Sequence, residues 1–382
     1  MDFSFTPEQE AFKEKVVRFA KDELNEGDLK QRDAECILSR DLWRKIAGFG
    51  ILGLPFEKAY GGAEQDIITT VLAMEALGYG CRDNGLLFSM NGQMWTVQMP
   101  IAQFGTPEQK DKYLRGLIAG ELIGAHGITE AEAGSDVMSL GTTATRDGDH
   151  YVLNGAKVFC TNGPVADVFV IFATVDKSAG SLGLTGFIVD RDTPGLTISA
   201  NRRKMGLRTS PMAWLTLEDC RVPVTARIGK EGQGGRIFNN SMEWERSSIL
   251  ANLVGAMEHQ VEQCVAHANK RTQFRKPIGK FQSVSNRIVD MKLRHETSRL
   301  LLYKVAWLKK TKGSCPMEAA LAKLYLSEAW VASCQNSVVI HGGYGYMADY
   351  EVERDFRDAV GSLLYSGTSD IQRTIAARAL GL

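Results

Sequence analysis

The sequence predicts an α+β chain in three parts: helices, then a small all-β unit, then a bundle of long helices. Before residue 120, apolar residues recur at helical spacing between helix start signals. The middle part has short alternating segments with turn residues between them, and after about residue 232 apolar residues again recur every three or four positions. We therefore expect domains at 1–120, 121–232 and 233–382, a number that suits a chain of 382 residues.

Composition narrows the class of protein. Lys plus Arg and Asp plus Glu both total 45, so the net charge is zero, which argues against nucleic-acid binding by bulk charge. No apolar run approaches the ~18–20 residues that span a bilayer. The start, Met1–Phe5, lacks the basic and apolar regions of a signal peptide. We expect a cytoplasmic protein with no membrane partner.

Cysteine and histidine patterns give no metal or disulfide signal. The seven cysteines are odd in number, widely spaced and contain no C-x-x-C pair. The six histidines form no H-x-x-E or H-x-x-x-H pattern. We expect reduced thiols and no metal site.

The N-terminal part should be helical. Thr6-Pro7-Glu8-Gln9 combines a capping residue, a first-turn proline and a capping-box glutamine. A second helix should begin near Ser39 and end at Gly48–Gly50, and a third should cover about 67–79. Thr106-Pro107-Glu108-Gln109 repeats the start signal before a short amphipathic helix that ends near Leu117.

The middle part should form a small β-barrel or sandwich. Alternating segments flank Asp147-Gly148-Asp149, which predicts a hairpin. Segments 167–175, 185–189, 196–199 and 213–220 are also β-rich, with turn residues every ~8–12 positions.

The C-terminal part should contain long helices. One apolar stripe steps by four, three, four and four through Leu250, Val254, Met257, Val261 and Val265. Comparable helices fit 283–311 and 316–339, and a last helix should follow Thr368. Such helices can bury one stripe within a subunit and a second against a neighbour.

The loop at Ile128–Asp136 is the first candidate binding motif. It joins small residues and hydroxyls, among them Thr129, Gly134 and Ser135, to free backbone amides. Such a loop can lie flat against a planar ligand and hydrogen-bond ring carbonyls or phosphates. An ordinary entry loop of a barrel explains the segment alone equally well.

Four further motifs are each weak when taken singly. They are Phe159–Gly163, Arg271–Phe274 with Gln282, His341–Tyr346 and Tyr365–Arg373. The glycine-rich run at 341–346 does not follow a strand, so it is not a dinucleotide-binding fingerprint, and a helix end with a turn explains it alone. Gly367-Thr368-Ser369 alone could be a helix cap.

Together, in this order and spacing, the motifs resemble the acyl-CoA dehydrogenase family over essentially the whole chain. Phe104–Lys110 and Lys204–Arg208 share the resemblance. It implies an N-terminal all-α domain, a middle β-barrel and a C-terminal four-helix bundle. FAD would lie between barrel and bundle of a homo-oligomer, a tetramer or a dimer, and an electron-transfer flavoprotein or O₂ would accept the electrons.

The resemblance also implies cofactor contacts. They match Ile128, Thr129, Gly134, Ser135, Phe159 and Thr161 at the barrel, Arg271, Phe274 and Gln282 toward a neighbouring subunit's FAD, and Gly342, Gly343, Thr368 and Gln372 near the end of the chain. Two positions depart from the family: Phe159 stands where Trp is frequent, and Arg275 stands where Gly is usual.

Thioester dehydrogenation needs a carboxylate base that removes the α-proton while hydride leaves the β-carbon on the other side. In much of the family a glutamate precedes the Gly-Thr of the last motif, but here that residue is Ser366. A minority of the family carries the glutamate on the first long bundle helix just before an arginine, which matches Glu245 and Arg246. Glu243, two residues away, is the runner-up.

A narrower resemblance concerns the substrate. Ser366, Met242–Glu245 and Phe281–Arg287 are similar to L-prolyl-[peptidyl carrier protein] dehydrogenases of natural-product biosynthesis. This implies a phosphopantetheinyl carrier protein as partner, a dehydroprolyl or pyrrolyl thioester as product, and substrate contacts from Ser135, Trp244, Arg246, Tyr365, Ser366 and Gly367.

Two other functions stay open at this point. One is a short- or branched-chain acyl-CoA dehydrogenase, and the other is a non-catalytic flavoprotein subunit, which loss of the usual base would suit. The basic groups at Arg202–Lys204 and Lys309–Lys312 could meet an acidic carrier or could simply form a solvated face.

Overall fold

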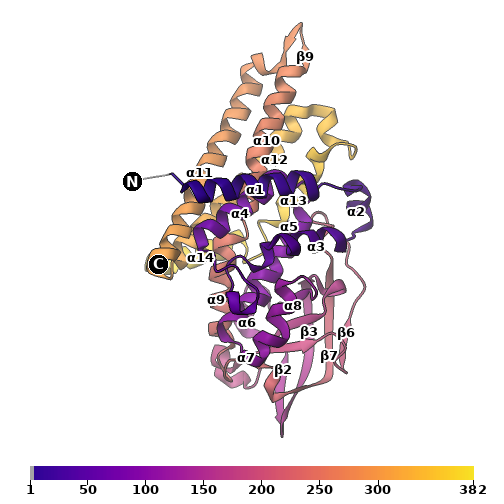
Figure 1. The fold of residues 1–382 in the computed structure, drawn as a ribbon, viewed down its shortest axis with the longest axis vertical. Helices are drawn as coiled ribbons and strands as arrows, with labels where there is room; N and C mark the ends of the chain where they lie inside the picture. The colour runs from indigo at the N-terminus through magenta and orange to yellow at the C-terminus, as the bar shows by residue number, and fades with distance from the viewer. Residues whose placement is uncertain (1–3) are drawn as a thin grey trace.

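The computed structural model describes residues 4–382 and confirms the order helices, β unit, helices (Figure 1). Residues 1–3, which belong to the Met1–Phe5 segment considered above for a signal peptide, lie outside this range. In the described part of the chain, no helix is both long and apolar enough to cross a membrane.

The N-terminal part contains eight α-helical segments within the described range. They are α1 (Pro7–Glu23), α2 (Leu29–Glu35), α3 (Arg40–Phe49), α4 (Ile67–Gly80), α5 (Asn84–Gln93), α6 (Met99–Phe104), α7 (Pro107–Gln109) and α8 (Arg115–Ile118), with π-helical turns at Met94–Gln98 and Lys110–Leu114. Both predicted Thr-Pro-Glu-Gln starts form complete capping boxes. The sequence pattern missed α2, which has only seven residues, and α5, which is buried nearly all round and so shows no amphipathic stripe.

The middle part is one bent sheet with a small core of its own. Its strands are β1 (Gly124–Gly127), β2 (Thr143–Asp147), β3 (His150–Thr161), β4 (Val168–Thr174), β5 (Leu184–Asp190), β6 (Leu196–Ile198), β7 (Met212–Pro223) and β8 (Arg227–Ile228). They pair in the order β6-β7-β3-β2-β4-β5-β8, and β1 lies parallel to β4. The predicted hairpin is confirmed, with Asp147 opposite His150.

Strand β4 joins this sheet to the helices because both of its faces are buried. Phe169 and Ile171 pack inside the sheet, whereas Val170 and Phe172 pack into the helical core. Side chains alternate between faces along a strand, so a strand between two cores must be apolar throughout.

The C-terminal part holds the long helices. They are α9 (Gly234–Ser248), α10 (Ala251–Lys270), α11 (Gln282–Lys312) and α12 (Pro316–His341), followed by the shorter α13 (Glu351–Gly361) and α14 (Ser369–Ala379). A small hairpin of β9 (Thr272–Gln273) and β10 (Lys276–Pro277) caps the far end of the bundle (Figure 1). The predicted stripe on α10 is buried only at Leu250, Val254 and Met257, since Val265 is exposed. Helix α13 was not predicted.

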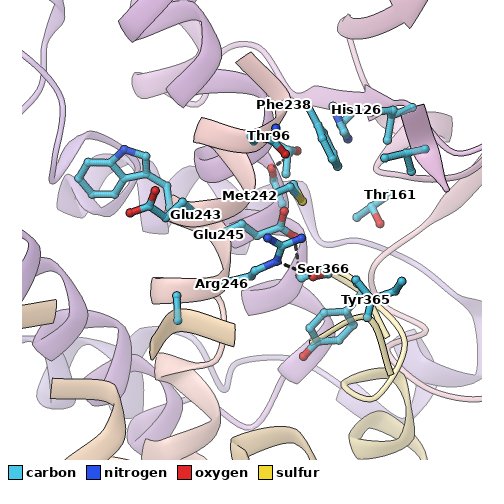
Figure 2. A pocket seen from close by; sticks show the side chains of 18 of the residues that line it. Thr96, His126, Thr161, Phe238, Met242, Glu243, Glu245, Arg246, Tyr365 and Ser366 are labelled. Atoms are coloured by element: carbon cyan, nitrogen blue, oxygen red, sulfur yellow. Dashed lines mark hydrogen bonds between the residues drawn. The ribbon is translucent and has the colours of Figure 1, made fainter. Parts of the chain in front are cut away.

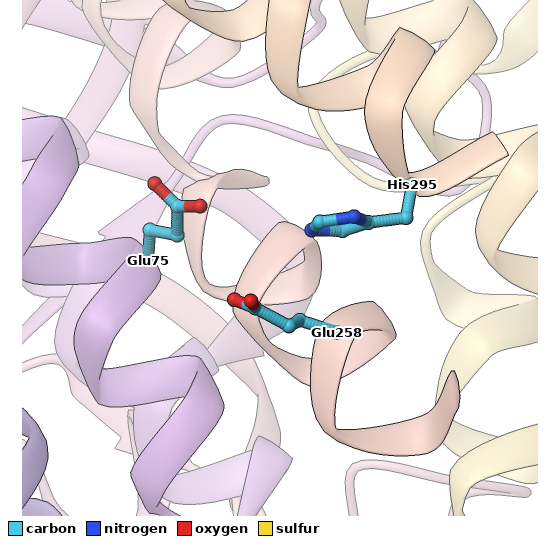
Figure 3. A group of neighbouring side chains, drawn as sticks. All are labelled: Glu75, Glu258 and His295. Atoms are coloured by element: carbon cyan, nitrogen blue, oxygen red, sulfur yellow. The ribbon is translucent and has the colours of Figure 1, made fainter. Parts of the chain in front are cut away.

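A buried polar cluster lies where α4, α10 and α11 meet. Glu75, Glu258 and His295 converge there, with their ligand-type atoms within 4.8 Å of one another (Figure 3). Both oxygens of Glu75 already accept hydrogen bonds, one from Arg299 Nε at 2.6 Å and one from the Tyr303 hydroxyl. Arg299 therefore supplies the positive charge that a cation would bring, and we assign the cluster to helix packing.

Candidate functional site

A cavity of about 2190 Å³ lies where the three parts of the chain meet. The N-terminal helices contribute Phe88 and Thr96, the sheet contributes Phe159 and Thr161, and α9 contributes Glu245. Of the residues predicted from sequence, the cavity brings together Ile128, Thr129, Gly134, Ser135, Phe159, Thr161, Trp244, Glu245, Arg246, Tyr365, Ser366, Gly367 and Thr368.

The 128–142 loop is held open toward the cavity by a buried ion pair. Lys157, which has no exposed surface, places Nζ 2.6 Å from Glu130 Oε1. The Glu130 carboxylate also accepts from the amides of Gly141 and Thr142 at 2.6 and 2.9 Å, so both ends of the loop are tied to one side chain. Ser135, at the loop's exposed middle, faces the cavity.

Phe159 reaches the cavity through a β-bulge. The register of β3 against β7 shifts by one residue between Lys157 and Cys160, and Phe159 in the bulge has a φ of 59°. An aromatic residue rarely adopts a positive φ, and the side chain is 61% exposed. A strained, exposed aromatic ring beside a large cavity suits stacking or edge contact with a planar ligand.

Glu245 is the buried carboxylate of the site. It lies one turn after Ser241, whose hydroxyl donates to the Trp95 carbonyl oxygen at 2.7 Å and so fixes this face of α9. Glu245 is only 6% exposed; its Oε1 accepts from Ser366 Oγ at 2.7 Å, and its Oε2 has no partner among the described residues. Burial raises the pKa of Glu245, while the Ser366 hydrogen bond and Arg246 oppose that shift. A desolvated carboxylate with one free oxygen is equipped to accept a proton.

Glu243, the runner-up, is fully engaged elsewhere. It accepts from Lys309 Nζ at 3.1 Å, from Ser314 Oγ at 2.9 Å and from the Cys315 amide at 3.0 Å. These bonds tie α9 to the turn between α11 and α12. Figure 2 shows Glu243 on the side of the helix away from Ser366. The geometry therefore favours Glu245 over Glu243.

The turn that carries Ser366 is clamped through its backbone. Arg246 Nε donates to the Ser366 carbonyl oxygen at 3.1 Å, and Gln372 Nε2 donates to the same oxygen at 3.0 Å and to that of Gly367 at 2.9 Å. Ser366 and Gly367 both have positive φ. Among the described residues, neither of their amides donates a hydrogen bond.

Aromatic side chains form the apolar walls. Trp244 lies parallel to Trp95 with ring centroids 6.2 Å apart, and Tyr365 packs on Phe88 at 4.6 Å. Lys309 Nζ lies 4.4 Å from the centre of the Trp244 ring. Phe88, Trp244 and Tyr365 all line the cavity that also contains Glu245.

Sequence reasoning missed two polar residues near the cavity. His126 on β1 lines it beside Phe238, its Nε2 is buried without a partner among residues 4–382, and burial lowers its pKa to about 3 (Figure 2). Lys323 on α12 has no exposed surface, donates to the Ser362 carbonyl oxygen at 2.8 Å, and burial lowers its pKa to about 8. A single His in a strand and a single Lys in a helix carry no signal of burial in the sequence.

Several predicted cofactor residues lie outside this cavity. Arg271, Gly342 and Gly343 line a separate pocket of about 460 Å³ near the far end of the bundle. Phe274 is 88% exposed and Gln282 is also exposed. Gln372 is buried under the 366–367 turn, and the Thr368 hydroxyl caps α14 by accepting from the Ile371 amide. In a single chain, Gln372 thus supports the turn instead of facing the cavity.

The two basic groups have local partners. Lys309 pairs with Glu243 and Lys310 with Asp66, while Lys204 donates to the Ser210 carbonyl oxygen. Arg202 stacks on Trp214. These local contacts explain the positions of several of these basic side chains without a carrier protein.

Comparison with known proteins decides the family. Models of the acyl-CoA dehydrogenase N-terminal, middle and C-terminal domains match residues 6–121, 125–220 and 232–381. The chain belongs to the acyl-CoA dehydrogenase family. An L-prolyl-[peptidyl-carrier protein] dehydrogenase of Serratia sp. is 40% identical over 382 residues, which cover 100% of this chain and 99% of that protein.

Solved structures of family members agree in fold. The crystal structure of the prolyl acyl carrier protein oxidase AnaB is 51% identical, with a TM-score of 0.97 over 99% of this chain and 100% of that one. The structure described as PigA with FAD and proline is 40% identical, with a TM-score of 0.97 over the full length of both chains.

Proposed function

We propose that this family member is an FAD-dependent dehydrogenase of a carrier-bound prolyl thioester, with Glu245 as the base. The observation that carries the proposal is the free Oε2 of a buried Glu245 in a chain whose usual base position is Ser366. The named functions of the Serratia relative and of AnaB support the prolyl thioester over an acyl-CoA.

The residues of the chain divide the work. Glu245 Oε2 accepts the α-proton of the prolyl thioester, and burial of this side chain keeps its contact with water small. The amides of Ser366 and Gly367, which have no acceptor among the described residues, can hold the thioester oxygen while negative charge develops on it. The product is the α,β-dehydroprolyl thioester; a second oxidation would give the pyrrolyl thioester.

The cavity fits FAD. It has the volume for a large ligand, an exposed Phe159 ring on a strained bulge, and a loop of hydroxyls and amides whose ends Glu130 ties together. Thr129, Ser135 and Thr161 would contact the ring system. When bound there, FAD supplies the acceptor for the hydride that leaves the β-carbon.

We also propose a homo-oligomer, with a tetramer favoured. Val289, Leu293, Leu300 and Trp307 follow one stripe of α11 and are 54–64% exposed. Arg271 lines a separate pocket and Phe274 is 88% exposed, so neither lines the cavity of its own chain, as expected if they serve a neighbour's cofactor.

Anaerobic titration of the purified holoprotein tests the function. Prolyl-carrier protein should bleach the flavin rapidly, whereas prolyl-CoA and free L-proline should do so poorly, because remote contacts with the arm and carrier orient the reacting carbon. Admitting O₂ or an electron-transfer flavoprotein afterwards identifies the electron acceptor. Equal rates with short-chain acyl-CoA would favour the acyl-CoA function, and no bleaching by any thioester would favour a non-catalytic subunit.

A further inference from the structure

Ser366 occupies the position that holds the base in much of the family, yet its hydroxyl hydrogen-bonds Glu245, the proposed base of this chain. Ser366 Oγ lies 2.7 Å from Glu245 Oε1, and this is the only hydrogen bond that Glu245 receives from a described side chain (Figure 2). A serine hydroxyl can donate one hydrogen bond, and here it donates that bond to the Glu245 carboxylate. Oε1 is thereby held, and Oε2 is left as the free oxygen.

The backbone of Ser366 is fixed independently of that hydroxyl. Arg246 and Gln372 both donate to its carbonyl oxygen, at 3.1 and 3.0 Å. Its φ of 59° is one that a non-glycine residue seldom adopts without such restraint. Arg246 thus fixes the turn through Nε, while its charge also favours the ionised form of Glu245.

We propose that Ser366 is a positioning residue that orients the Glu245 carboxylate and stabilises its ionised form through the hydrogen bond to Oε1. This inference rests on the proposed role of Glu245 as the base. Burial pushes the carboxylate toward its protonated form, in which it could not accept a proton. A donor on Oε1 stabilises the ionised form and leaves the orientation of Oε2 defined.

Infrared titration of the substrate-free holoprotein tests this proposal. The protonated Glu245 carboxyl has a C=O stretch that is identified by its loss in Glu245→Gln, and its midpoint is followed against pH. In Ser366→Ala and Ser366→Gly the midpoint should rise by about one pH unit or more, because a hydrogen bond to a charged group is lost. Ser366→Cys should give a smaller rise, because a thiol is a weak donor.

Comparing Ser366→Ala with Ser366→Gly separates the effect of the lost hydroxyl from the effect of backbone strain. Gly accepts a positive φ freely and Ala does not, so a rise in Ala alone would assign the effect to backbone strain and overturn the proposal. Unchanged midpoints in both would also overturn it. The titration uses no substrate, so a raised midpoint in a protein that no prolyl thioester reduces would uphold the positioning of Glu245 while rejecting the proposed function.

Discussion

At the scale of single residues, Glu245 should control the chemical step. Glu245→Gln keeps the size of the side chain but removes the proton acceptor, and loss of a general base typically costs ~10²–10⁴-fold in rate. We expect flavin reduction, followed at 450 nm after anaerobic mixing with prolyl-carrier protein, to slow by about that factor. FAD content should be unchanged, because Glu245 hydrogen-bonds Ser366 at the substrate side.

Glu243→Gln is the matched control for this change. It weakens the contacts to Lys309, Ser314 and Cys315 and should lower the thermal midpoint, yet flavin reduction should stay close to the wild-type rate. If Glu243→Gln slows reduction as strongly as expected for Glu245→Gln, and Glu245→Gln does not, the base is Glu243.

Burial of Glu245 also predicts a pH-dependent effect on stability. Its pKa is raised in the folded protein, so the folded state binds this proton more tightly than the unfolded chain does. That stabilisation is full below the unfolded pKa of about 4.3 and is lost as the pH rises through the folded pKa. Glu245→Gln should therefore melt higher than wild type at pH 8 and close to wild type at pH 4, as measured by differential scanning calorimetry. A gap that does not change with pH would contradict this account.

The sequence led us to predict Glu245 as the base but not the contacts around it. The empty base position at Ser366 and the Glu-Arg pair on α9 were sufficient to nominate the residue. Its surroundings depend on how α9, α12 and α14 pack together, and no local sequence pattern predicts that packing. They include the Ser366 hydrogen bond to Oε1, the Gln372 hydrogen bond to the turn and the buried Lys323.

At the scale of elements, predictions succeeded where local chemistry fixes a boundary. Thr6 and Thr106 cap their helices as expected, and the hairpin turns at Gly148 with a φ of 61°. They failed at α5, whose residues are apolar on all sides because it lies inside the molecule. Burial on every face removes the periodicity on which the prediction depends.

The contact of α4 with α10 gives an element-scale prediction. A Cβ added at Gly255 would lie 1.9 Å from the Glu75 carbonyl oxygen, and one at Gly78 would lie 1.7 Å from that of Asn252. Both obstacles are backbone, so Gly255→Ala must push the helices apart and should cost more than the ~1–3 kcal/mol typical of overpacking. Urea unfolding measures the loss.

Gly48→Ala is the control for the helix contact. Gly48 lies on the exposed face of α3 with nothing within 4 Å of an added Cβ, so this change should stabilise by up to about 1 kcal/mol through helix propensity. Equal effects at Gly48 and Gly255 would show that the two helices do not pack as closely as described.

At the scale of the whole molecule, the proposed cofactor contacts of one chain lie in two separate pockets. The cavity holds Thr129, Phe159 and Glu245, whereas Arg271 and Gly342 line the pocket toward the far end of the bundle. Matching to the family led us to expect this for Arg271 but not for Gly342, and composition and periodicity could predict neither, because they carry no information on a neighbouring subunit. A closed homo-oligomer would let each far end complete another chain's site.

This division predicts that FAD and the α11 stripe both stabilise the assembly. Removal of FAD should weaken the oligomer. Leu293→Glu should dissociate it, because the new charge would be buried if the exposed apolar stripe of α11 packs against a neighbouring subunit. Light scattering at several protein concentrations measures both effects. Leu182→Glu, at a still more exposed leucine beside the barrel, should leave the mass unchanged. A holoprotein that is monomeric at every concentration would rule out a shared cofactor site, and Arg271 and Phe274 would then need another role.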